Sequence, residues 1–181
     1  WGGDEADQDG EVTLNIPEKH FFPWSPDSPF LYDLTVGTTQ GGEESFDTVH
    51  SYFALRKWSC EPDKKGILRF CLNGEPILLN GLLDQGYWPE GLYTPPSDAA
   101  VVHELQTVKE LGFNLLRKHA KIEPQRWYYH CDKLGLIVWQ DMVNGGEPYK
   151  LWFVTYLTNV FQPLLRRLPD ARPLWGLLGR E

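Results

Sequence analysis

The chain has 181 residues, a length that fits one ordinary domain or parts of two. Apolar residues make up 41% and charged residues 23%, a balance that supports a packed core and excludes intrinsic disorder. A net charge of −8 without a long basic run argues against nucleic-acid binding, because phosphate recognition needs clustered lysine and arginine. No apolar stretch approaches the roughly 20 residues that span a bilayer. We therefore predict a soluble chain without a signal peptide or transmembrane segment, and its compartment and oligomeric state stay open.

Three cysteines form no Cys-x-x-Cys pair and no metal-ligand spacing. Cys60, Cys71 and Cys131 are an odd number, so at least one thiol is free, and we expect them to be small buried residues. The sequence therefore predicts neither a metal nor a cofactor. Residues 1–3, Trp-Gly-Gly, do not look like a natural N-terminus, so we expect further chain before them.

The first part of the chain has the alternating pattern of half-buried strands. Apolar and polar residues alternate over 11–16, 30–36 and 47–57, with turn-forming residues between them, including 37–44. Three strands at this spacing predict part of an antiparallel sandwich. We expect Trp24 to pin the proline-rich link between the first two strands to the sheet, together with Tyr32. This packing role is favoured over sugar stacking by the tryptophan.

A charged segment over 61–66 is predicted to be a linker. The apolar runs 67–72 and 76–82 then flank Asn73-Gly74, the strongest short signal for a β-hairpin. The linker and hairpin lead into a segment with a different pattern.

From residue 77 onward, short apolar runs alternate with amphipathic ones. Runs at 77–83, 113–116 and 136–139 predict three strands of a parallel sheet, the first buried on both faces. The predicted helices run from an N-cap at Ser97 to Gly112, from Glu123-Pro124 to Gly135, and over 149–168. The order is that of a βαβαβ unit.

Such a unit needs a continuation, either into an eight-stranded barrel or into an open doubly wound sheet. The open sheet needs a glycine-rich first turn for phosphate, and residues 83–88 (LDQGYW) contain only one useful glycine. The long aromatic loop over 84–96 favours the barrel, and a nucleotide-binding open sheet is the alternative. Because a partial barrel exposes strand edges, we expect the piece to be poorly soluble alone or completed by further chain.

Polar side chains follow each predicted parallel strand, at the end where a barrel places its site. Asp84 can accept hydrogen bonds from sugar hydroxyls, or it can pair with Arg117, which we expect to be buried and paired in either role. Asp141 lies at a strand end, and His119 is more often structural than catalytic. The substrate-binding candidates are Asp84, Tyr87, Trp88, Arg117, His119 and Asp141.

Two of these candidates are aromatic. Tyr87 and Trp88 lie in the long loop and are the best sugar-stacking residues, with internal packing as the alternative. The nearby carboxylates Glu90, Glu123 and Glu147 are expected to be solvated or to cap helices.

Five motifs together resemble one family. WSPDSPFLYDLTV, DTVHSYFALRK, LNGEPILLNG, LGFNLLRKH and EPQRWYYHCDKLGLIVWQD occur in the order found in the β-galactosidase/β-glucuronidase family, glycoside hydrolase family two. The resemblance covers Val12 to about Met142. It implies a mixed fold that is incomplete in this chain. The end of an immunoglobulin-like β-sandwich over residues 1–60 would precede the first βα units of a TIM (β/α)8 barrel over 61–181.

The resemblance also implies a function for the intact protein: retaining hydrolysis of β-glycosides, with a carbohydrate substrate and neither nucleic-acid nor membrane partners. Two departures matter. The usual Arg-x-Ser-His is replaced by Arg117-Lys118-His119, and residues 83–86 lack the usual histidine. Retaining hydrolysis needs two carboxyl groups roughly 5 Å apart. In the family the acid/base glutamate follows an asparagine, but this chain has no Asn-Glu pair and ends after the third barrel strand and helix.

We therefore assign no catalytic residue to the chain and expect the piece alone to be inactive. The alternative is a non-catalytic carbohydrate-binding or interaction module.

Overall fold

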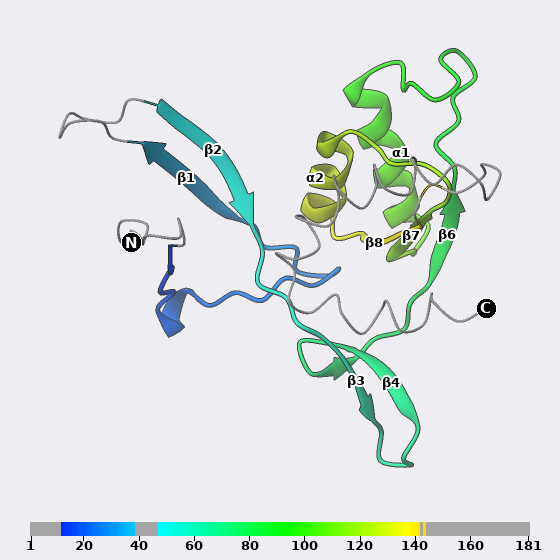
Figure 1. The fold of residues 1–181 in the computed structure, drawn as a ribbon. Coiled ribbons are helices and arrows are strands. Elements are labelled where there is room, and N and C mark those ends of the chain that lie inside the picture. Colours follow the sequence, from blue (N-terminus) through cyan, green and yellow to red (C-terminus); the bar gives the residue numbers. More distant parts are fainter. Residues whose placement is uncertain (1–11, 39–46, 142, 144–181) are drawn as a thin grey trace, which may run out of the picture.

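A computed structural model describes residues 12–38, 47–141 and 143 (Figure 1). Within these residues, three small sheets and two α-helices form a mixed fold. The strands are β1 (Tyr32–Thr38), β2 (Asp47–Phe53), β3 (Trp58–Pro62), β4 (Leu68–Leu72), β5 (Glu75–Pro76), β6 (Gly81–Asp84), β7 (Leu115–Lys118) and β8 (Ile137–Gln140). The helices are the short 3-10 helix η1 (Glu18–His20), α1 (Asp98–Glu110) and α2 (Gln125–Leu134).

β1 and β2 form an antiparallel ribbon that confirms two of the predicted strands. Their register runs from Tyr32 opposite Phe53 to Thr38 opposite Asp47. The ring of Tyr32 stacks on that of Phe53, with centroids 4.9 Å apart, and the Tyr32 hydroxyl donates to the carbonyl of His20 at 2.6 Å. Tyr32 is thus buried and anchored, as predicted. Most of the predicted link over 37–44 lies outside the described residues.

The predicted strand over 11–16 is wrong for the residues that are described. Residues 12–16 have no regular secondary structure, and no backbone hydrogen bond joins them to a described strand. An alternating pattern makes a strand only where a neighbour pairs with its N–H and C=O groups. The pattern alone was therefore insufficient.

β3 and β4 form a hairpin where the sequence predicted a linker. Its turn is closed by Asp63, whose carboxylate accepts from the backbone N–H of Lys65 at 2.8 Å and of Ile67 at 3.0 Å. These two bonds and the one from Arg69 lower the pKa of Asp63. The charged residues over 61–66 thus belong to the end of a strand and a tight turn.

The Asn73-Gly74 hairpin is confirmed, because both residues have positive φ, 54° and 85°, and join Leu72 to Glu75 across β4 and β5. Its second strand is much shorter than predicted. β5 has two residues, and the chain then leaves this sheet to form β6 in another one. Figure 1 shows the β3–β4 hairpin and the β1–β2 ribbon extending away from the helices in different directions.

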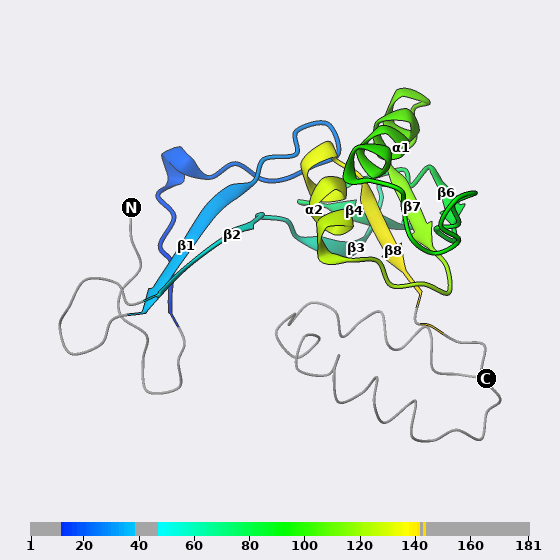
Figure 2. The ribbon, with the colours of Figure 1, turned by 90° about the horizontal axis from the view of Figure 1, so that it is seen from above.

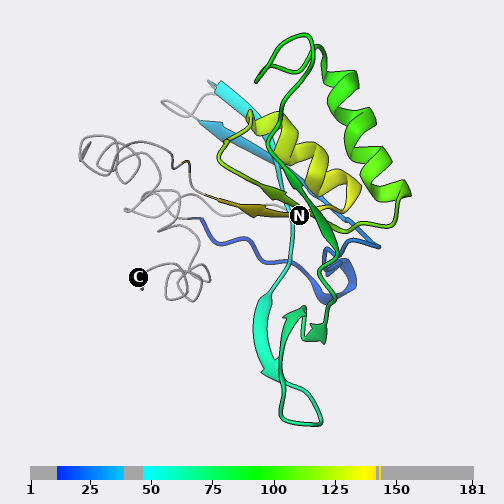
Figure 3. The same ribbon diagram turned by 90° about the vertical axis from the view of Figure 1, so that its right-hand side faces the viewer.

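The α/β part confirms the predicted βαβαβ order. β6, β7 and β8 are parallel neighbours in that sequence, and both helices lie on one side of the sheet (Figures 2 and 3). The Ser97 hydroxyl caps α1 by accepting from the N–H of Ala100 at 3.1 Å. Gly112 follows α1 with φ 85°, and Gly135 ends α2 in the left-handed conformation. The predicted helix over 149–168 lies outside the described residues.

The core lies mainly between the helices and the sheet. Its buried members are Val101, Leu105, Val108, Leu116, Trp127, Cys131 and Leu136. A second cluster covers the other face of the sheet near the start of its strands and consists of Trp24, Leu72, Leu115 and Ile137. The indole of Trp24 is fully buried and donates to the carbonyl of Asp132 at 2.7 Å, which confirms its packing role.

Two predictions about burial are wrong. The run 77–83 is not covered on both faces, since Leu83 is 56% exposed and Leu78 is more exposed still. β6 pairs with only one described strand, β7, so this part of the sheet has an open edge. Cys60 is exposed, whereas Cys71 and Cys131 are buried. In the described residues no helix is both long and apolar enough to cross a membrane.

Candidate functional site

The register of the parallel strands sorts the strand-end residues onto two faces of the sheet. Successive side chains of a strand point to opposite faces, and residues in register point to the same one. One row consists of Leu83, Arg117 and Trp139, and the next consists of Asp84, Lys118 and Gln140. The two rows therefore face in opposite directions.

The core clusters show which row faces the helices. Leu116 packs against α1 and α2, so Lys118, two residues later, lies on this helix face. Leu115 packs against Trp24 on the other side, so Arg117 lies on the face without helices. We call this second side, at the carboxyl ends of β6–β8, the open face.

Lys118 is the centre of a buried ion network on the helix face. Its side chain is fully buried, and its Nζ atom contacts a carboxylate oxygen of Asp84 and lies 3.0 Å from Oε1 of Glu123. The same Nζ atom lies 4.2 Å from the ring centroid of Trp127. Burying an ammonium group is costly unless it is paired, and the two carboxylates and the indole ring supply these partners.

Lys121 extends this network to the loop that follows β6. Its Nζ atom lies 2.8 Å from Oε1 of Glu123 and donates to the carbonyls of Gly86 at 2.9 Å and Tyr93 at 2.7 Å. Gly86 has φ +66°, and a Cβ there would lie 2.4 Å from Oε1 of Glu123. The other carboxylate oxygen of Asp84 accepts from the N–H of Gly86 at 2.6 Å. Only glycine fits this close approach.

These contacts correct three expectations. Asp84 does not pair with Arg117, because the two side chains point to opposite faces, and it pairs with Lys118 instead. Arg117 is paired, with Asp141 at 2.9 Å, but its side chain is 50% exposed and is not buried. Glu123 is buried between two lysines and is neither solvated nor a cap. Glu90 is exposed, and Glu147 lies outside the described residues.

Three of the predicted site residues lie at the carboxyl ends of the strands, where Arg117 pairs with Asp141 and His119 contacts Gln85. Nε of Arg117 also donates to Asp141, at 3.0 Å, so the guanidinium and the carboxylate are held side by side. Nε2 of Gln85 donates to Nδ1 of His119 at 2.8 Å. Because Nδ1 accepts, a neutral His119 carries its proton on Nε2 and offers a donor there.

Two residues of the open face were missed by the sequence analysis. Gln85 holds His119, and Trp139 lies in register with Arg117 with its side chain 43% exposed. Trp139 was treated only as part of an apolar strand. The signal that identifies both is the alternation of side chains: Gln85 is one residue beyond Asp84, and Trp139 is two residues before Asp141.

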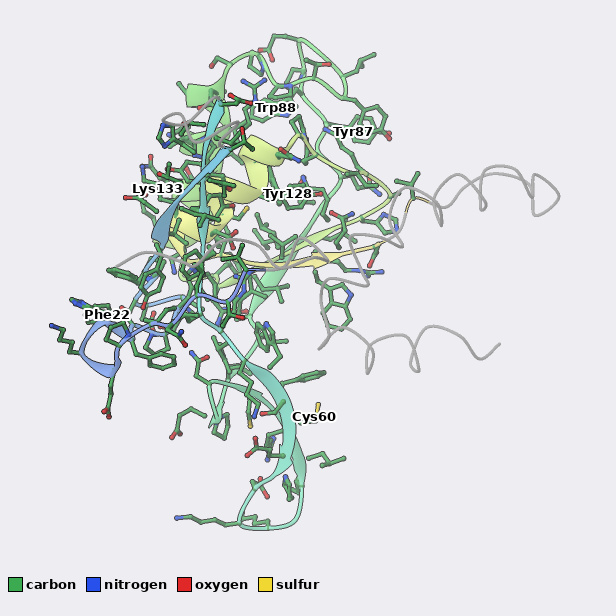
Figure 4. All side chains as sticks on the ribbon, turned by 60° about the vertical axis from the view of Figure 1, so that its left-hand side comes forward. Phe22, Cys60, Tyr87, Trp88, Tyr128 and Lys133 are labelled. Carbon is green, nitrogen blue, oxygen red and sulfur yellow. The ribbon has the colours of Figure 1, made fainter. Side chains whose placement is uncertain are left out.

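The loop after β6 separates the two aromatic candidates. Trp88 is half-buried and packs against the main core, which favours the packing role over sugar stacking. Tyr87 is exposed and contacts Tyr93, with 2.7 Å between their hydroxyl oxygens and 4.5 Å between ring centroids. Figure 4 shows Tyr87 and Trp88 in this loop.

A small hollow lies beside β6 and α1 and is lined by Asp84, Gln85, Tyr87, Glu104 and Val108 among others. Burial, followed by the nearby Asp84 carboxylate, raises the pKa of Glu104 above its ordinary value. The hollow does not reach the Arg117–Asp141 pair, so we do not place the site there. Among the described residues, no cluster of histidine, cysteine, aspartate or glutamate has the arrangement of a metal site.

Comparison with known proteins gives relatives of one chemical class. A β-galactosidase of Leuconostoc mesenteroides subsp. mesenteroides is 30% identical over 155 residues, which is 83% of this chain and 14% of that protein. An exo-β-D-glucosaminidase of Amycolatopsis orientalis is 30% identical over 130 residues, 67% of this chain and 12% of that protein. The chain thus spans a small part of the curated relatives that it matches. No family model matches the chain.

Solved structures agree with these relatives. The apo structure of β-glucuronidase 3 from Bacteroides uniformis has a TM-score of 0.63 and 29% identity, and covers 78% of this chain and 18% of that one. A GH2 β-galacturonidase from Eisenbergiella tayi bound to galacturonate has a TM-score of 0.62 and 25% identity, with coverage of 72% and 22%. The similarity therefore extends to the fold as well as to the sequence.

Proposed function

Since this chain is a homologue of one segment of glycoside hydrolase family two, the β-galactosidase/β-glucuronidase family, we propose that the intact protein hydrolyses β-glycosides with retention. The relatives named for β-galactosidase and exo-β-D-glucosaminidase support an enzyme of this class. The chain contains no Asn-Glu pair. The proposal therefore assigns it a substrate-binding role and no catalytic carboxylate.

We propose the same division of the fold that the resemblance implies. Residues 1–60 would be the end of an immunoglobulin-like sandwich, and residues 61–181 the start of a (β/α)8 barrel. The parallel order of β6, β7 and β8, with both helices on one side, supports the barrel, since a barrel keeps its helices outside. The proposed boundary falls within β3, whose hairpin partner β4 leads toward the barrel strands.

The observation that supports the proposed site is the Arg117–Asp141 ion pair on the open face, with the Gln85–His119 hydrogen bond also at the carboxyl ends of the strands. Active sites of barrels lie at this end. Sugar hydroxyls both donate and accept hydrogen bonds. The Arg117 guanidinium and Nε2 of His119 can donate to them, and Asp141 keeps lone pairs that can accept.

Asp84 takes a supporting role in this proposal. Its two carboxylate oxygens are engaged by Lys118 and by the N–H of Gly86, on the face away from Arg117. Asp84 therefore fixes the start of the loop that carries Tyr87. We place the sugar against the open face, with Trp139 beside it as an apolar ring.

The test is hydrolysis by the intact protein of 4-nitrophenyl β-galactoside, β-glucuronide and β-glucosaminide. We expect turnover of at least one of them with retention, which is read by NMR of the first product anomer. The alternative is a non-catalytic carbohydrate-binding or interaction module. Sugar binding by calorimetry without any turnover would support the module and contradict the enzyme.

A further inference from the structure

We propose that Gln85 is a positioning residue for His119. Its amide keeps the imidazole proton on Nε2, so His119 donates a hydrogen bond to an oxygen of the bound sugar and does not act as a base. The inference rests on the proposed function where it concerns the sugar. The position of the proton is a property of the protein alone and can be measured without turnover.

The amide and the imidazole contact each other directly. Nε2 of Gln85 lies 2.8 Å from Nδ1 of His119. An amide nitrogen donates and does not accept, so Nδ1 must be the acceptor. A ring nitrogen accepts only where it carries no proton, which leaves the proton of the neutral ring on Nε2. The hydrogen bond therefore selects one of the two neutral tautomers.

The ends of β6 and β7 keep the two side chains together. The strands pair up to Asp84 opposite Lys118, and the N–H of His119 donates to the carbonyl of Asp84 at 2.8 Å. This bond extends the parallel ladder by one step, so Gln85 and His119 lie next to each other at the strand ends. The Asp84 carboxylate also accepts from the N–H of Gly86. The backbone on both sides of Gln85 is thus fixed, and its amide reaches the imidazole without the cost of ordering a free loop.

The backbone is also fixed on the other side of His119. Ala120 has φ +55°, in the left-handed region that residues other than glycine seldom adopt. The next residue, Lys121, pairs with buried Glu123. A strained residue such as Ala120 persists only where its surroundings hold it. The backbone of His119 is thus held before and after the residue, and the Gln85 amide orients its ring.

The chemistry of the partner decides what Nε2 of the imidazole can do. A carboxylate beside Nδ1 accepts a hydrogen bond from it and leaves Nε2 free to act as a base, as in the Ser-His-Asp triad. The Gln85 amide reverses this arrangement, because it donates to Nδ1 and leaves an N–H group on Nε2. Among the residues that the structure describes, none forms a hydrogen bond with Nε2, and His119 is only partly buried. A hydroxyl oxygen of a pyranose is an acceptor that fits this donor.

The first measurement is NMR of the intact protein with 15N-labelled histidine, at about pH 9, where an imidazole is neutral. His119→Gln identifies the signals of His119 by their loss. We expect two-bond 15N–1H correlations to place the proton on Nε2 in the wild type. In Gln85→Glu we expect it on Nδ1, because the new carboxylate can only accept. A wild-type His119 with its proton on Nδ1 would overturn the inference.

The second measurement is kcat/KM for the nitrophenyl glycoside that the wild type cleaves, taken as the ratio of Gln85→Glu to wild type at each pH. At about pH 6 the imidazole beside the new carboxylate is protonated and donates from both nitrogens, so we expect a ratio near one. At about pH 9 only Nδ1 keeps its proton, and we expect the ratio to fall about tenfold, the scale of one lost hydrogen bond. Ionisable groups that both enzymes share cancel in the ratio, and at these strand ends they are Asp84, Arg117, Lys118 and Asp141.

Gln106→Glu is the matched control, because Gln106 is an exposed glutamine of α1. Its ratio to the wild type should stay near one at both pH values. A ratio for Gln85→Glu that is the same at both pH values would overturn the donor role, since a purely structural loss does not follow the imidazole proton. If Gln85→Glu does not fold, Gln85→Met replaces it. This variant should show both tautomers, and a spectrum with the proton on Nε2 alone would overturn the role of Gln85.

The proposed function can fail separately from this inference. It fails if the wild type cleaves none of the nitrophenyl glycosides, and the NMR measurement still decides where the proton lies. Calorimetry with galactose, glucuronate and glucosamine at about pH 9 then replaces kcat/KM. We expect Gln85→Glu to bind about tenfold more weakly than the wild type. Equal affinities, or no binding by either protein, would overturn the donor role.

Discussion

The α/β part (β6–β8 with α1 and α2) and the two antiparallel ribbons that precede it, β1–β2 and β3–β4, differ in how far their apolar side chains are buried. In the α/β part, Leu105, Leu116 and Leu136 are almost completely buried between two helices and three strands. In the ribbons, large apolar side chains such as Val49 and Leu68 stay exposed. The α/β part buries its residues against elements that are near in sequence, and the ribbons do not.

The difference follows from what each unit pairs with. A helix buries its apolar side on the strands before and after it, so the βαβαβ segment supplies its own core. A two-stranded ribbon has backbone partners but no layer on its faces. Trp24, before β1, and Leu72, at the end of β4, are buried because they pack against the sheet of the α/β part. The contacts of the ribbons with the α/β part should therefore contribute more to the free energy of unfolding than the exposed residues of the ribbons do.

We expect the largest change in the free energy of unfolding when Lys118 is replaced. Lys118→Met leaves Asp84 and Glu123 without their shared cation, and we expect a loss of about 3–5 kcal/mol in the free energy of unfolding. Urea unfolding of the intact protein, followed by tryptophan fluorescence, measures it. Lys64→Met removes an exposed lysine from the β3–β4 turn and should cost less than about 0.5 kcal/mol. Equal losses of unfolding free energy in the two variants would contradict a stabilising role for the buried ion network.

The next prediction compares two glycines that have the same φ, +76°, but differ in how closely other atoms surround them. Gly135→Ala puts a Cβ 2.2 Å from the carbonyl oxygen of Pro26, where α2 meets the N-terminal segment. We expect a loss of about 3 kcal/mol, from left-handed strain and from the clash together. Gly66→Ala has no atom within 4 Å, so the strain alone should cost about 1–2 kcal/mol. Thermal unfolding measures the loss of stability in both variants. Equal losses would contradict this prediction.

Asp132 joins the ribbons to α2. It accepts from Arg56 at 2.9 Å and from the hydroxyl of Tyr52 at 3.1 Å. We expect Asp132→Ala to cost about 1–2 kcal/mol in urea unfolding, because Tyr52 loses its acceptor. Asp33→Ala, at an exposed position of β1, should stay within about 0.5 kcal/mol of the wild type. A harmless Asp132→Ala would show that the junction contributes little.

The smallest effect is a pH dependence of opposite sign in the two parts. The raised pKa of Glu104 means that the native state holds its proton more tightly than the unfolded state. Its contribution to stability therefore falls as the pH rises above the ordinary value of 4.5. Glu104→Gln should raise stability at pH 7 by on the order of 0.5 kcal/mol, and the gain should vanish at acid pH.

Asp63 in the β3–β4 turn has a lowered pKa, so its contribution is present at neutral pH and is lost as the pH falls. Asp63→Asn should therefore lower stability at pH 7 more than at acid pH. Unfolding curves recorded from pH 3 to pH 8 give the stability of both variants as a function of pH. A gain for Glu104→Gln that grows toward acid pH would contradict the assignment.

The same contrast explains what the sequence predicted well. Helix termini in the α/β part follow local signals, which depend on nearby residues alone: α1 begins after the Ser97 cap and α2 ends at Gly135. Two errors in the predicted secondary structure lie before the α/β part: a strand over 11–16 that lacks a described partner, and a linker over 61–66 that is the end of a strand and its turn. Pairing between strands depends on residues far along the chain, which an alternating pattern does not identify.

In the site, the residue types were predicted but their partners were not. The strand ends were identified, yet the ion pair considered for Asp84, as the alternative to sugar binding, was with Arg117 of the next strand. Counting from buried Leu116 places Lys118 on its side of the strand and Arg117 on the other. What no count provides is which side of the sheet the helices cover, because that depends on packing in three dimensions.

The central claim is that the open face contacts the sugar and the helix face supports it. The most direct test is kcat/KM of Arg117→Met in the intact protein, with Arg126→Met, on the exposed surface of α2, as the control. We expect Arg117→Met to lose about 10- to 100-fold in kcat/KM, the scale of a charged hydrogen bond, with the free energy of unfolding changed by less than about 1 kcal/mol. Wild-type kcat/KM in Arg117→Met would contradict the claim.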